Sequence, residues 1–411
     1  MNESPASPST DGSHRSIADL THAELAVLAR EFLLAGHLID RAGMPIVTAM
    51  GLETMRDIAI EEWMGASPVY TRRMQRLLGF EGDTVEVALK GMQLDIGAPP
   101  EFMDFRMSVQ DDHHGSFHLD HCGALMDVEP MGDDFVVAMC HHIEDPTFDA
   151  TGWATNPKLR MRPIHRPPRT PADRQPHCAW TVTIDPEEPD TPTPERALEI
   201  GRTNAAQVPL AIVDGPSEDG HGDYSYPLDA DLRMEHFSSP VLRALLDEVS
   251  LQGHLLVLSF ASAVADYGDL AKTIDTVSKQ FTGTAGVAAE RIARAFGLGD
   301  RAEDLATAFE LHPAFHPRSY VDWNVEVDGD VVRLALGDAP SRTEGYESWI
   351  TVLAAGNDRA LQAIATGVDR HWVVEPDGPG RWIVRRTDTL AEDFDEVTLT
   401  KFSTGVAFAF S

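Results

Sequence analysis

All three cysteines of this 411-residue chain lie beside a histidine, and this pairing is the clearest sign of chemistry in the sequence. The pairs are His121-Cys122, Cys140-His141 and His177-Cys178, and no cysteine follows Cys178. Sulfur and imidazole are ligands that zinc and other transition metals prefer, and a thiolate beside an imidazole can also act as a nucleophile. The first half of the chain therefore predicts a transition-metal or thiolate site that the second half lacks.

The segment CHHIED concentrates three types of ligand on one face of an expected helix. Successive helix residues are about 100° apart, so Cys140 and Glu144 lie about 40° apart and His141 follows about 60° further on. Asp145 lies at the edge of this face, and His142 points away from it. A thiolate, an imidazole and a carboxylate so arranged form a partial coordination set for Zn²⁺ or Fe²⁺. The alternative is a buried cysteine beside a solvated polar face.

The strand-like segment FHLDHC supplies a second cysteine. Strand alternation would put His118, Asp120 and Cys122 on one face and His121 on the other. The glycine that follows Cys122 would let the backbone turn and a ligand approach. Cys178 stands directly before the strand-like segment AWTVTI and would complete the site.

Together these segments define the predicted site. The expected metal ligands are His121, Cys122, Cys140, His141, Glu144 and Cys178. The thiols favour zinc over iron as the bound transition metal. His121 is the weakest of the six because alternation points it away from Cys122. The expected catalytic residues are Cys122, Glu144 and Asp145: the thiol would act as metal ligand or nucleophile, and the carboxylates would transfer protons.

The elements that must position these residues begin with a long helix. Thr21 and Glu24 form an S/T-x-x-E capping box before an apolar run with helical spacing. Two more helical stretches follow, and the last of them ends near Gly79. After them we expect strand-like segments at 102–110 and 115–125, a helix over 133–145, a proline-rich extended stretch at 162–178 and a strand over 179–184.

The same order recurs in the second half. Gly253-His254 lies 217 residues after Gly36-His37, and Gly297 and Asp322 lie 218 residues after Gly79 and Asp104. The segment ESWITVLAAGND resembles DDFVVAMCHHIED, and GPGRWIVRR resembles PHCAWTVTI. We therefore expect an α+β protein of two tandem copies, each with N-terminal helices packed on a small antiparallel sheet. The second copy would be degenerate, since it has no cysteine. Two unrelated α+β domains with similar helix boundaries are the alternative.

These patterns also predict the boundaries of the domains. Residues 1–20 would be a disordered tail, 21–184 the α+β domain with the metal or cysteine site, 185–238 a linker and polar segment, and 239–411 the degenerate repeat. The linker is rich in Pro, Asp and Glu, a composition typical of exposed loops.

The composition excludes several classes of partner. The formal net charge is −33, so neither nucleic acid nor an anionic membrane is expected to bind. The chain has no run of 18 apolar residues and no signal-peptide pattern at its N-terminus, so we expect no membrane span and a cytoplasmic location. A small-molecule substrate is the expected partner. The sequence leaves open whether the protein forms a homodimer.

The order of the three cysteines resembles the L-2-amino-thiazoline-4-carboxylate hydrolase-like family, which is related to the 4-vinyl reductase and NO-signalling ligand-binding domains. The residues that carry the resemblance are a cysteine near a strand end (Cys122), a C-x-x-x-[DE] helix (Cys140 to Glu144 or Asp145) and a late cysteine before a final strand (Cys178). The resemblance implies helices before a small antiparallel sheet, and a site made of these residues. The extra histidines, the long proline-rich stretch and the second copy depart from the family pattern.

Three functions remain open from the sequence. The first is a metal- or cysteine-dependent hydrolase of a small polar heterocycle or amide, with or without a carboxylate. In it, arginines between residues 160 and 169 could orient an acidic group. The second is a non-heme iron oxygenase or lyase. The third is a ligand-binding module whose cysteines hold structural zinc. We expect an enzyme, and a hydrolase first.

Overall fold

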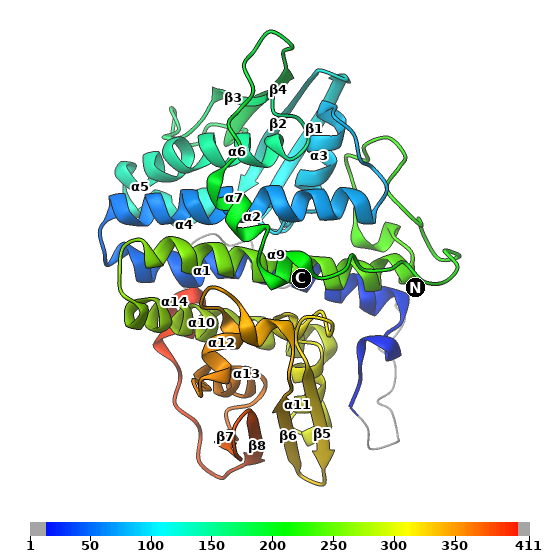
Figure 1. Ribbon diagram of the computed structural model, residues 1–411, viewed down its shortest axis with the longest axis vertical. Coiled ribbons are helices and arrows are strands. Elements are labelled where there is room, and N and C mark those ends of the chain that lie inside the picture. Colours follow the sequence, from blue (N-terminus) through cyan, green and yellow to red (C-terminus); the bar gives the residue numbers. More distant parts are fainter. Residues whose placement is uncertain (1–13, 402–411) are drawn as a thin grey trace.

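The computed structural model describes residues 14–401, and it has two four-stranded antiparallel sheets separated by long helices (Figure 1). The first half contains η1 (Ile17–Asp19), α1 (His22–Thr48), α2 (Leu52–Leu77), α3 (Val85–Gln93), β1 (Met103–Asp111), β2 (His114–Cys122), α4 (Gly123–Val128), η2 (Glu129–Met131), α5 (Asp133–Val137), η3 (Ala138–Ile143), α6 (Glu144–Trp153), β3 (Leu159–His165) and β4 (Cys178–Ile184). The segment between the halves contains α7 (Glu195–Ile200), α8 (Asn204–Gln207) and η4 (Met234–His236).

The second half repeats this order of elements. It contains α9 (Ser239–Ala265), α10 (Leu270–Phe296), α11 (Ala302–Glu310), η5 (Pro313–Phe315), β5 (Trp323–Asp328), β6 (Val331–Leu336), η6 (Pro340–Thr343), α12 (Trp349–Ala354), α13 (Arg359–Val368), β7 (Trp372–Pro376), β8 (Arg381–Arg386) and α14 (Asp395–Lys401). The strand order is β1-β2-β4-β3 in the first sheet and β5-β6-β8-β7 in the second, which is the same order. The α+β class with two small antiparallel sheets is thus as expected.

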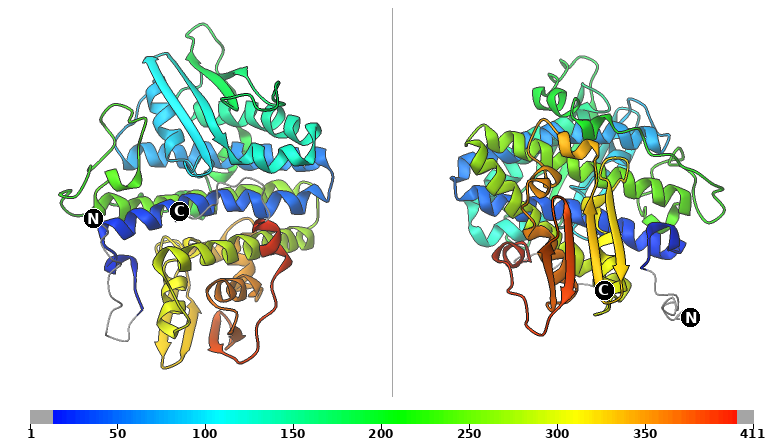
Figure 2. Two further views of the ribbon diagram at one scale, coloured as in Figure 1. Left: turned by 180° about the vertical axis from the view of Figure 1, so that it is seen from behind. Right: turned by 60° about the horizontal axis from the view of Figure 1, so that its bottom comes forward.

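The long helices of the two halves pack against each other in the middle of the molecule, with one sheet at each end (Figures 1 and 2). Helix α1 packs along α10, and α2 packs along α9. A Cβ added to Gly65 of α2 would clash with Ser259 of α9, and one added to Gly283 of α10 would lie 3.2 Å from the Cβ of Ala42 in α1. Gly283 lies 218 residues after Gly65 and Ser259 lies 217 after Ala42, so the two close contacts are reciprocal.

Local sequence features explain where helix α1 begins and why strand β3 lies at the edge of its sheet. Thr21 and Glu24 form the expected capping box before α1, which is confirmed. Strand β3 occupies part of the stretch expected to be extended and irregular. It contains Pro163 and lies at the edge of its sheet, where a residue without an N–H is tolerated.

Helix α9 is the one helix among residues 14–401 that is long and apolar enough to cross a membrane, and 89% of its most apolar stretch is buried inside the protein. The predicted tail lies mostly outside the described residues. Its described part, from residue 14, includes η1 and the buried Leu20. The predicted linker, 185–238, also carries buried side chains, among them Ile200, Tyr224 and Phe237.

Candidate functional site

A cavity of about 620 Å³ lies between the long helices of the first half, its sheet and the α4–α6 region, with Leu399 of α14 also in its wall. Most of its wall is apolar or aromatic, from side chains such as Met44, Met55, Trp63, Phe105 and Phe135. The titratable side chains in the wall are His37, Asp40, Arg41, Asp95, Asp127 and Glu144. An apolar cavity of this size with a few converging polar groups is the usual form of a small-molecule site.

Asp40 and Glu62 form a carboxyl pair at the side of this cavity. Trp63 Nε1 donates a hydrogen bond to Asp40 Oδ2 at 3.1 Å. Burial raises the pKa of Asp40 to about 7, although its bonds from Trp63 and Glu62 lower it. Burial and the charge of Asp40 raise the pKa of Glu62 well above its ordinary value. Within residues 14–401 no N–H or hydroxyl donor reaches the Glu62 carboxyl, so the two acids can bond only by sharing a proton.

His37 brings a neutral imidazole to the same wall. Its side chain is 94% buried and lies against Phe102, with 3.7 Å between ring centroids. Burial, and then the charge of Arg41, lower the pKa of His37 well below its ordinary value. Its Nδ1 is buried without a partner in the described chain. Arg41 itself pairs with Asp127 at 3.2 Å.

Asp95 is the best-satisfied acid in the wall. Tyr70 Oη donates to its Oδ1 at 2.9 Å, and the backbone N–H of Gly97 donates to the same oxygen at 2.7 Å. Burial still raises the pKa of Asp95 to about 6. Through its Oδ1 this carboxyl therefore holds the α2 helix to the loop before β1.

Glu144 connects the cavity to the cysteines. It lines the cavity, and its Oε2 is buried without a partner in the described chain. Burial raises the pKa of Glu144 to about 8, while Arg166 lowers it. Glu144 begins α6 directly after η3, a π-helical turn that interrupts the expected helix over 133–145. Such turns are rare and often occur at functional sites.

The three cysteines converge on Glu144. All three are free thiols, all are buried, and all belong to one apolar cluster. Burial raises the pKa of Cys122, and the charges of Cys178 and Glu144 raise it further. Cys140 is affected in the same way by Glu144 and both other thiols, and burial and Glu144 raise the pKa of Cys178 to about 12. The fold thus places four of the six predicted ligands, Cys122, Cys140, Cys178 and Glu144, in one region, but within residues 14–401 they are not arranged to hold a metal ion.

A β-bulge explains how Cys122 enters this cluster. Met103 pairs with Cys122 and Phe105 pairs with Leu119, so Asp120 and His121 both lie opposite Asp104. The extra residue reverses the alternation, which turns Cys122 inward while Asp120 stays exposed. The expectation that His118, Asp120 and Cys122 share a face is therefore wrong.

The contacts of Cys122 are those of a packed thiol. Its Sγ accepts a hydrogen bond from Leu125 N at 3.3 Å, which caps α4, and lies 3.6 Å from the sulfur of Met103. The next residue, Gly123, has no room for a side chain because a Cβ there would clash with the ring of Phe102. The glycine thus permits close packing of Phe102, where the sequence suggested the approach of a ligand.

The other predicted residues lie around this cluster. His141 Nε2 bonds to the carbonyl of Pro167 at 2.7 Å. Asp145 pairs with Arg166 at 2.5 Å, and the same arginine donates to the carbonyl of Cys140 at 3.3 Å. His121 points to a different, open pocket. Within residues 14–401, no three His, Cys, Asp or Glu side chains are arranged to hold a metal ion.

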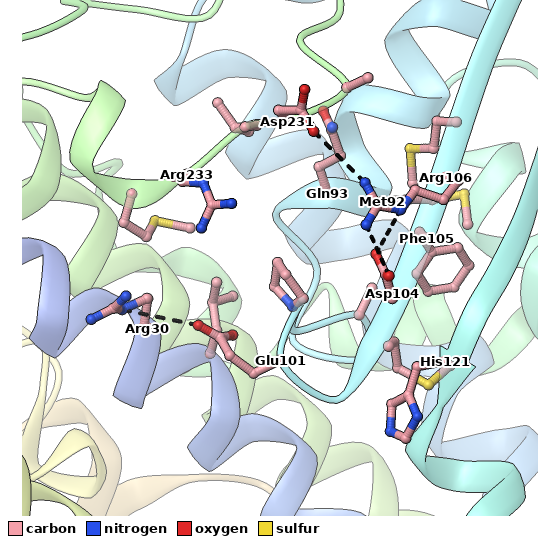
Figure 3. Close-up of a pocket in the computed structure, with 18 of the residues that line it drawn as sticks. Arg30, Met92, Gln93, Glu101, Asp104, Phe105, Arg106, His121, Asp231 and Arg233 are labelled. Carbon is pink, nitrogen blue, oxygen red and sulfur yellow. Dashed lines mark hydrogen bonds and ion pairs between the residues drawn. The ribbon is translucent and has the colours of Figure 1, made fainter. Parts of the chain in front are cut away.

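That second pocket, of about 430 Å³, lies between α1, the end of α3, β1 and the segment 230–235 (Figure 3). It is lined by ion pairs, among them Arg30 with Glu101 at 4.0 Å and Arg106 with Asp104 at 3.0 Å. Met92, Ala98, Met103 and Phe105 line both pockets and so separate them. This pocket is smaller than the first and a larger share of its wall is polar, so it is the weaker candidate for a site.

Sequence reasoning missed the polar groups on the long helices. His37 and Asp40 lie in the apolar run of α1, and Glu62 and Trp63 lie in α2. A charged residue inside an apolar helical face was the available signal, since such residues are rarely buried without a function or a partner. The arginines at 160–169 do not line the cavity. Arg162, Arg166 and Arg169 pair with Asp149, Asp145 and Glu129.

Comparisons of the chain with models of known protein families, with curated proteins and with solved structures give no match.

Proposed function

We propose that this protein is a hydrolase that acts on a small molecule held in the 620 Å³ cavity, with Glu144 as the residue that handles protons. The observation that carries the proposal is the position of Glu144. Its carboxyl lies in the cavity wall and has a buried oxygen without a partner in the described chain. Its charge also raises the pKa of three buried thiols. A carboxyl poised between a cavity and a ligand set is suited to give a proton to a leaving group or accept one from water.

Asp145 acts as a positioning residue in this proposal. Its ion pair with Arg166, together with the bond from Arg166 to the Cys140 carbonyl, fixes the start of α6 and therefore the Glu144 side chain. Cys122 serves as a metal ligand in preference to a nucleophile. Its raised pKa favours the neutral thiol, and nucleophilic cysteines need the thiolate.

Cys122, Cys140 and Cys178 would supply three donors to a transition metal, zinc before iron, and would leave the fourth position to a water beside Glu144. Among residues 14–401 these side chains are not arranged to hold the ion, so binding would require them to move. The support is chemical: the three buried thiols lie in one apolar cluster, and Glu144, whose buried Oε2 has no partner in the described chain, is near enough to raise the pKa of each of them. When bound, the metal would supply Lewis acidity and lower the pKa of a coordinated water. Metal binding to thiols also releases their protons, which would offset the raised pKa values.

The substrate would be largely apolar outside its reacting group. Aromatic and methionine side chains form most of the cavity wall, and the arginines expected to hold an acidic group are bonded elsewhere. A heterocycle or amide therefore fits better than a strongly acidic molecule. We propose no nucleic-acid or membrane partner, in keeping with the net charge of −33.

We also propose that the two halves arose by duplication and that the second is a degenerate copy. The same strand order, the same helix order and the reciprocal Gly65–Ser259 and Gly283–Ala42 contacts support this. The second copy has no cysteine, and Arg359 begins α13 as Glu144 begins α6. Its role would be structural, because α9 and α10 cover faces of α1 and α2.

A ligand-binding module with structural zinc is the second candidate. One observation favours it: the cysteines lie behind the cavity wall and do not line it. A fully protein-ligated zinc would stabilise the fold and leave no open coordination position.

The experiment that separates the two is a turnover screen with small heteroaromatic amides and esters, read by mass spectrometry. Glu144→Gln removes the exchangeable proton at nearly constant shape, so a hydrolase should lose about two or more orders of magnitude in kcat/KM. Glu187→Gln, at an exposed position, is the matched control and should keep full activity. Turnover that survives Glu144→Gln would end the hydrolase proposal, and zinc without any turnover would favour the binding module.

A further inference from the structure

The second half fills with its own side chain the region where the first half has a cavity. Trp349 begins α12, and only 4% of it is exposed. Its ring stacks on that of Phe281 with 4.9 Å between centroids and 8° between planes. Trp349 Nε1 donates to Gln280 Oε1 at 3.3 Å, and the ring of His254 lies 6.2 Å away, edge-on.

The residues that hold this indole have counterparts around the cavity of the first half. At the repeat offsets of 217 and 218, His254 corresponds to His37, Gln280 to Glu62 and Phe281 to Trp63. His37 and Trp63 line the cavity, and Glu62 lies behind Asp40 in its wall. The helices agree, because α9 corresponds to α1 and α10 to α2.

The counterpart of the indole itself is smaller and does not fill the space. In the similar segments ESWIT and DDFVV, Trp349 corresponds to Phe135. Phe135 is only half-buried and lies in the cavity wall. The first half thus keeps an aromatic ring (Trp63) and two polar groups (His37 and Glu62) at the positions that surround Trp349 in the second half. Among its described residues, no side chain fills the space of the Trp349 ring.

The polar groups around the two positions also differ in their hydrogen bonds. In the second half the Gln280 amide receives the indole N–H, and His254 Nε2 bonds to the carbonyl of His316 at 2.9 Å. In the first half His37 Nδ1 is buried without a partner among residues 14–401, and Glu62 can bond only to Asp40, through a shared proton. Leaving buried polar atoms unpaired is costly unless a ligand pairs with them.

We infer that the cavity binds a planar aromatic molecule that packs against Trp63 and donates an N–H to the Asp40–Glu62 carboxyl pair. This names the substrate class and rests on the duplication in the proposed function. The volume of about 620 Å³ leaves space for substituents beyond a single bicyclic ring. Trp63 Nε1 bonds to Asp40 Oδ2, and Asp40 Oδ1 is buried without an N–H or hydroxyl donor in the described chain. A ligand N–H would reach this oxygen once the side chains of the wall shift to admit it.

The test uses free indole as the probe and 1-methylindole, which has no N–H, as its matched control. Titration calorimetry on the purified full chain should show indole binding at least about tenfold more tightly than 1-methylindole, because 1-methylindole has no N–H and leaves the buried acceptor unpaired. Equal affinity for the two probes, or no binding of indole at millimolar concentration, would overturn the inference.

Two variants locate the binding in the cavity. Phe135→Trp supplies the missing indole and should abolish binding of free indole, whereas Phe296→Trp, at the end of α10 outside the cavity wall, should leave it unchanged. Asp40→Val introduces the residue that stands at position 257 and should remove the preference for the N–H probe. Undiminished binding in Phe135→Trp would contradict the proposed site. The readout is equilibrium binding, so a failed hydrolase screen leaves this inference standing, and a hydrolase that does not bind indole would overturn this inference alone.

Discussion

Arg73 of α2 and Glu248 of α9 form a buried two-bond ion pair, with Nε donating to Oε2 and Nη2 to Oε1, both at 2.7 Å. Arg73 also donates to the carbonyl of Val208 at 2.8 Å, and Glu248 accepts from the N–H of Ala211 at 3.0 Å. The pair therefore fixes the first half, the connecting segment and the second half to one another.

Removing one partner of this pair should be strongly destabilising. Arg73→Ala leaves the Glu248 carboxylate buried without its cation, which costs about 3–5 kcal/mol of unfolding free energy. Urea unfolding measures this. Arg106→Ala, which breaks an exposed ion pair with Asp104, is the control and should cost less than about 1 kcal/mol. The double variant Arg73→Met/Glu248→Leu should recover much of the lost unfolding free energy. If Arg73→Ala lost as little as the control, this ion pair would not be what holds the two halves together.

Trp349→Ala should open a cavity in the second half. Truncating a buried tryptophan costs about 3–5 kcal/mol, since the apolar contacts are lost and the space collapses only in part. Phe135→Ala is the matched change in the first half and should cost about 1 kcal/mol, because that side chain is half-buried beside an existing cavity. Equal losses in thermal or urea unfolding would mean that the two halves pack their aromatic positions alike.

The Asp40 carboxyl should make stability depend on pH. Burial raises its pKa from 3.8 to about 7, so the folded protein holds this proton more tightly than the unfolded chain. Its stabilising contribution is fully present below about pH 4 and is lost as the pH rises through about 7. Asp40→Asn removes the titration of this carboxyl, so the variant should gain stability relative to wild type as the pH rises from about 4 to about 7. Asp173→Asn, at an exposed site, should show no such change, and parallel profiles for Asp40→Asn and wild type would refute the assignment.

The thiol cluster should carry about one equivalent of zinc per chain when the protein is purified without chelators. Cys140→Ala and Cys122→Ala should each lose it, measured by elemental analysis. His121→Ala is the matched control, since His121 faces the open pocket and should leave the metal content unchanged. Wild-type protein with no transition metal would remove the metal from the mechanism.

The sequence predicted the parts of the fold that depend on local signals. Hydrophobic periodicity, together with capping and turn residues, predicted three features: the capping box at Thr21, the long helices, and the strands β2 and β4 that contain cysteines. Strand β3 could not, because Pro163 lowers the strand signal and only its edge position makes it tolerable.

The site was harder to predict than the fold. The clustering of Cys122, Cys140, Cys178 and Glu144 follows from their grouping in the first half, but the faces of Cys122 and Glu144 depend on a bulge and a π-helical turn. Each feature inserts one residue and has no sequence signature. The bulge reverses the faces of the strand residues that follow it, and the π-helical turn rotates the directions of the helix side chains that follow it. The cavity is a property of packing between distant helices, so no local pattern could reveal it.

The crossed packing of α1 with α10 and of α2 with α9 has a consequence for how this chain could be cut. Ile143, beside the cavity, shares an apolar cluster with Phe260 and Val264 of α9, so the first half alone would expose surface that only the second half covers. A nick in the exposed segment 214–223 interrupts none of the helices or strands, and the two fragments should then reassemble as a non-covalent heterodimer. Reassembly of the two fragments would show that the connecting segment acts as a tether, and that covalent continuity between the halves is not needed for the packing of α1 with α10 and of α2 with α9.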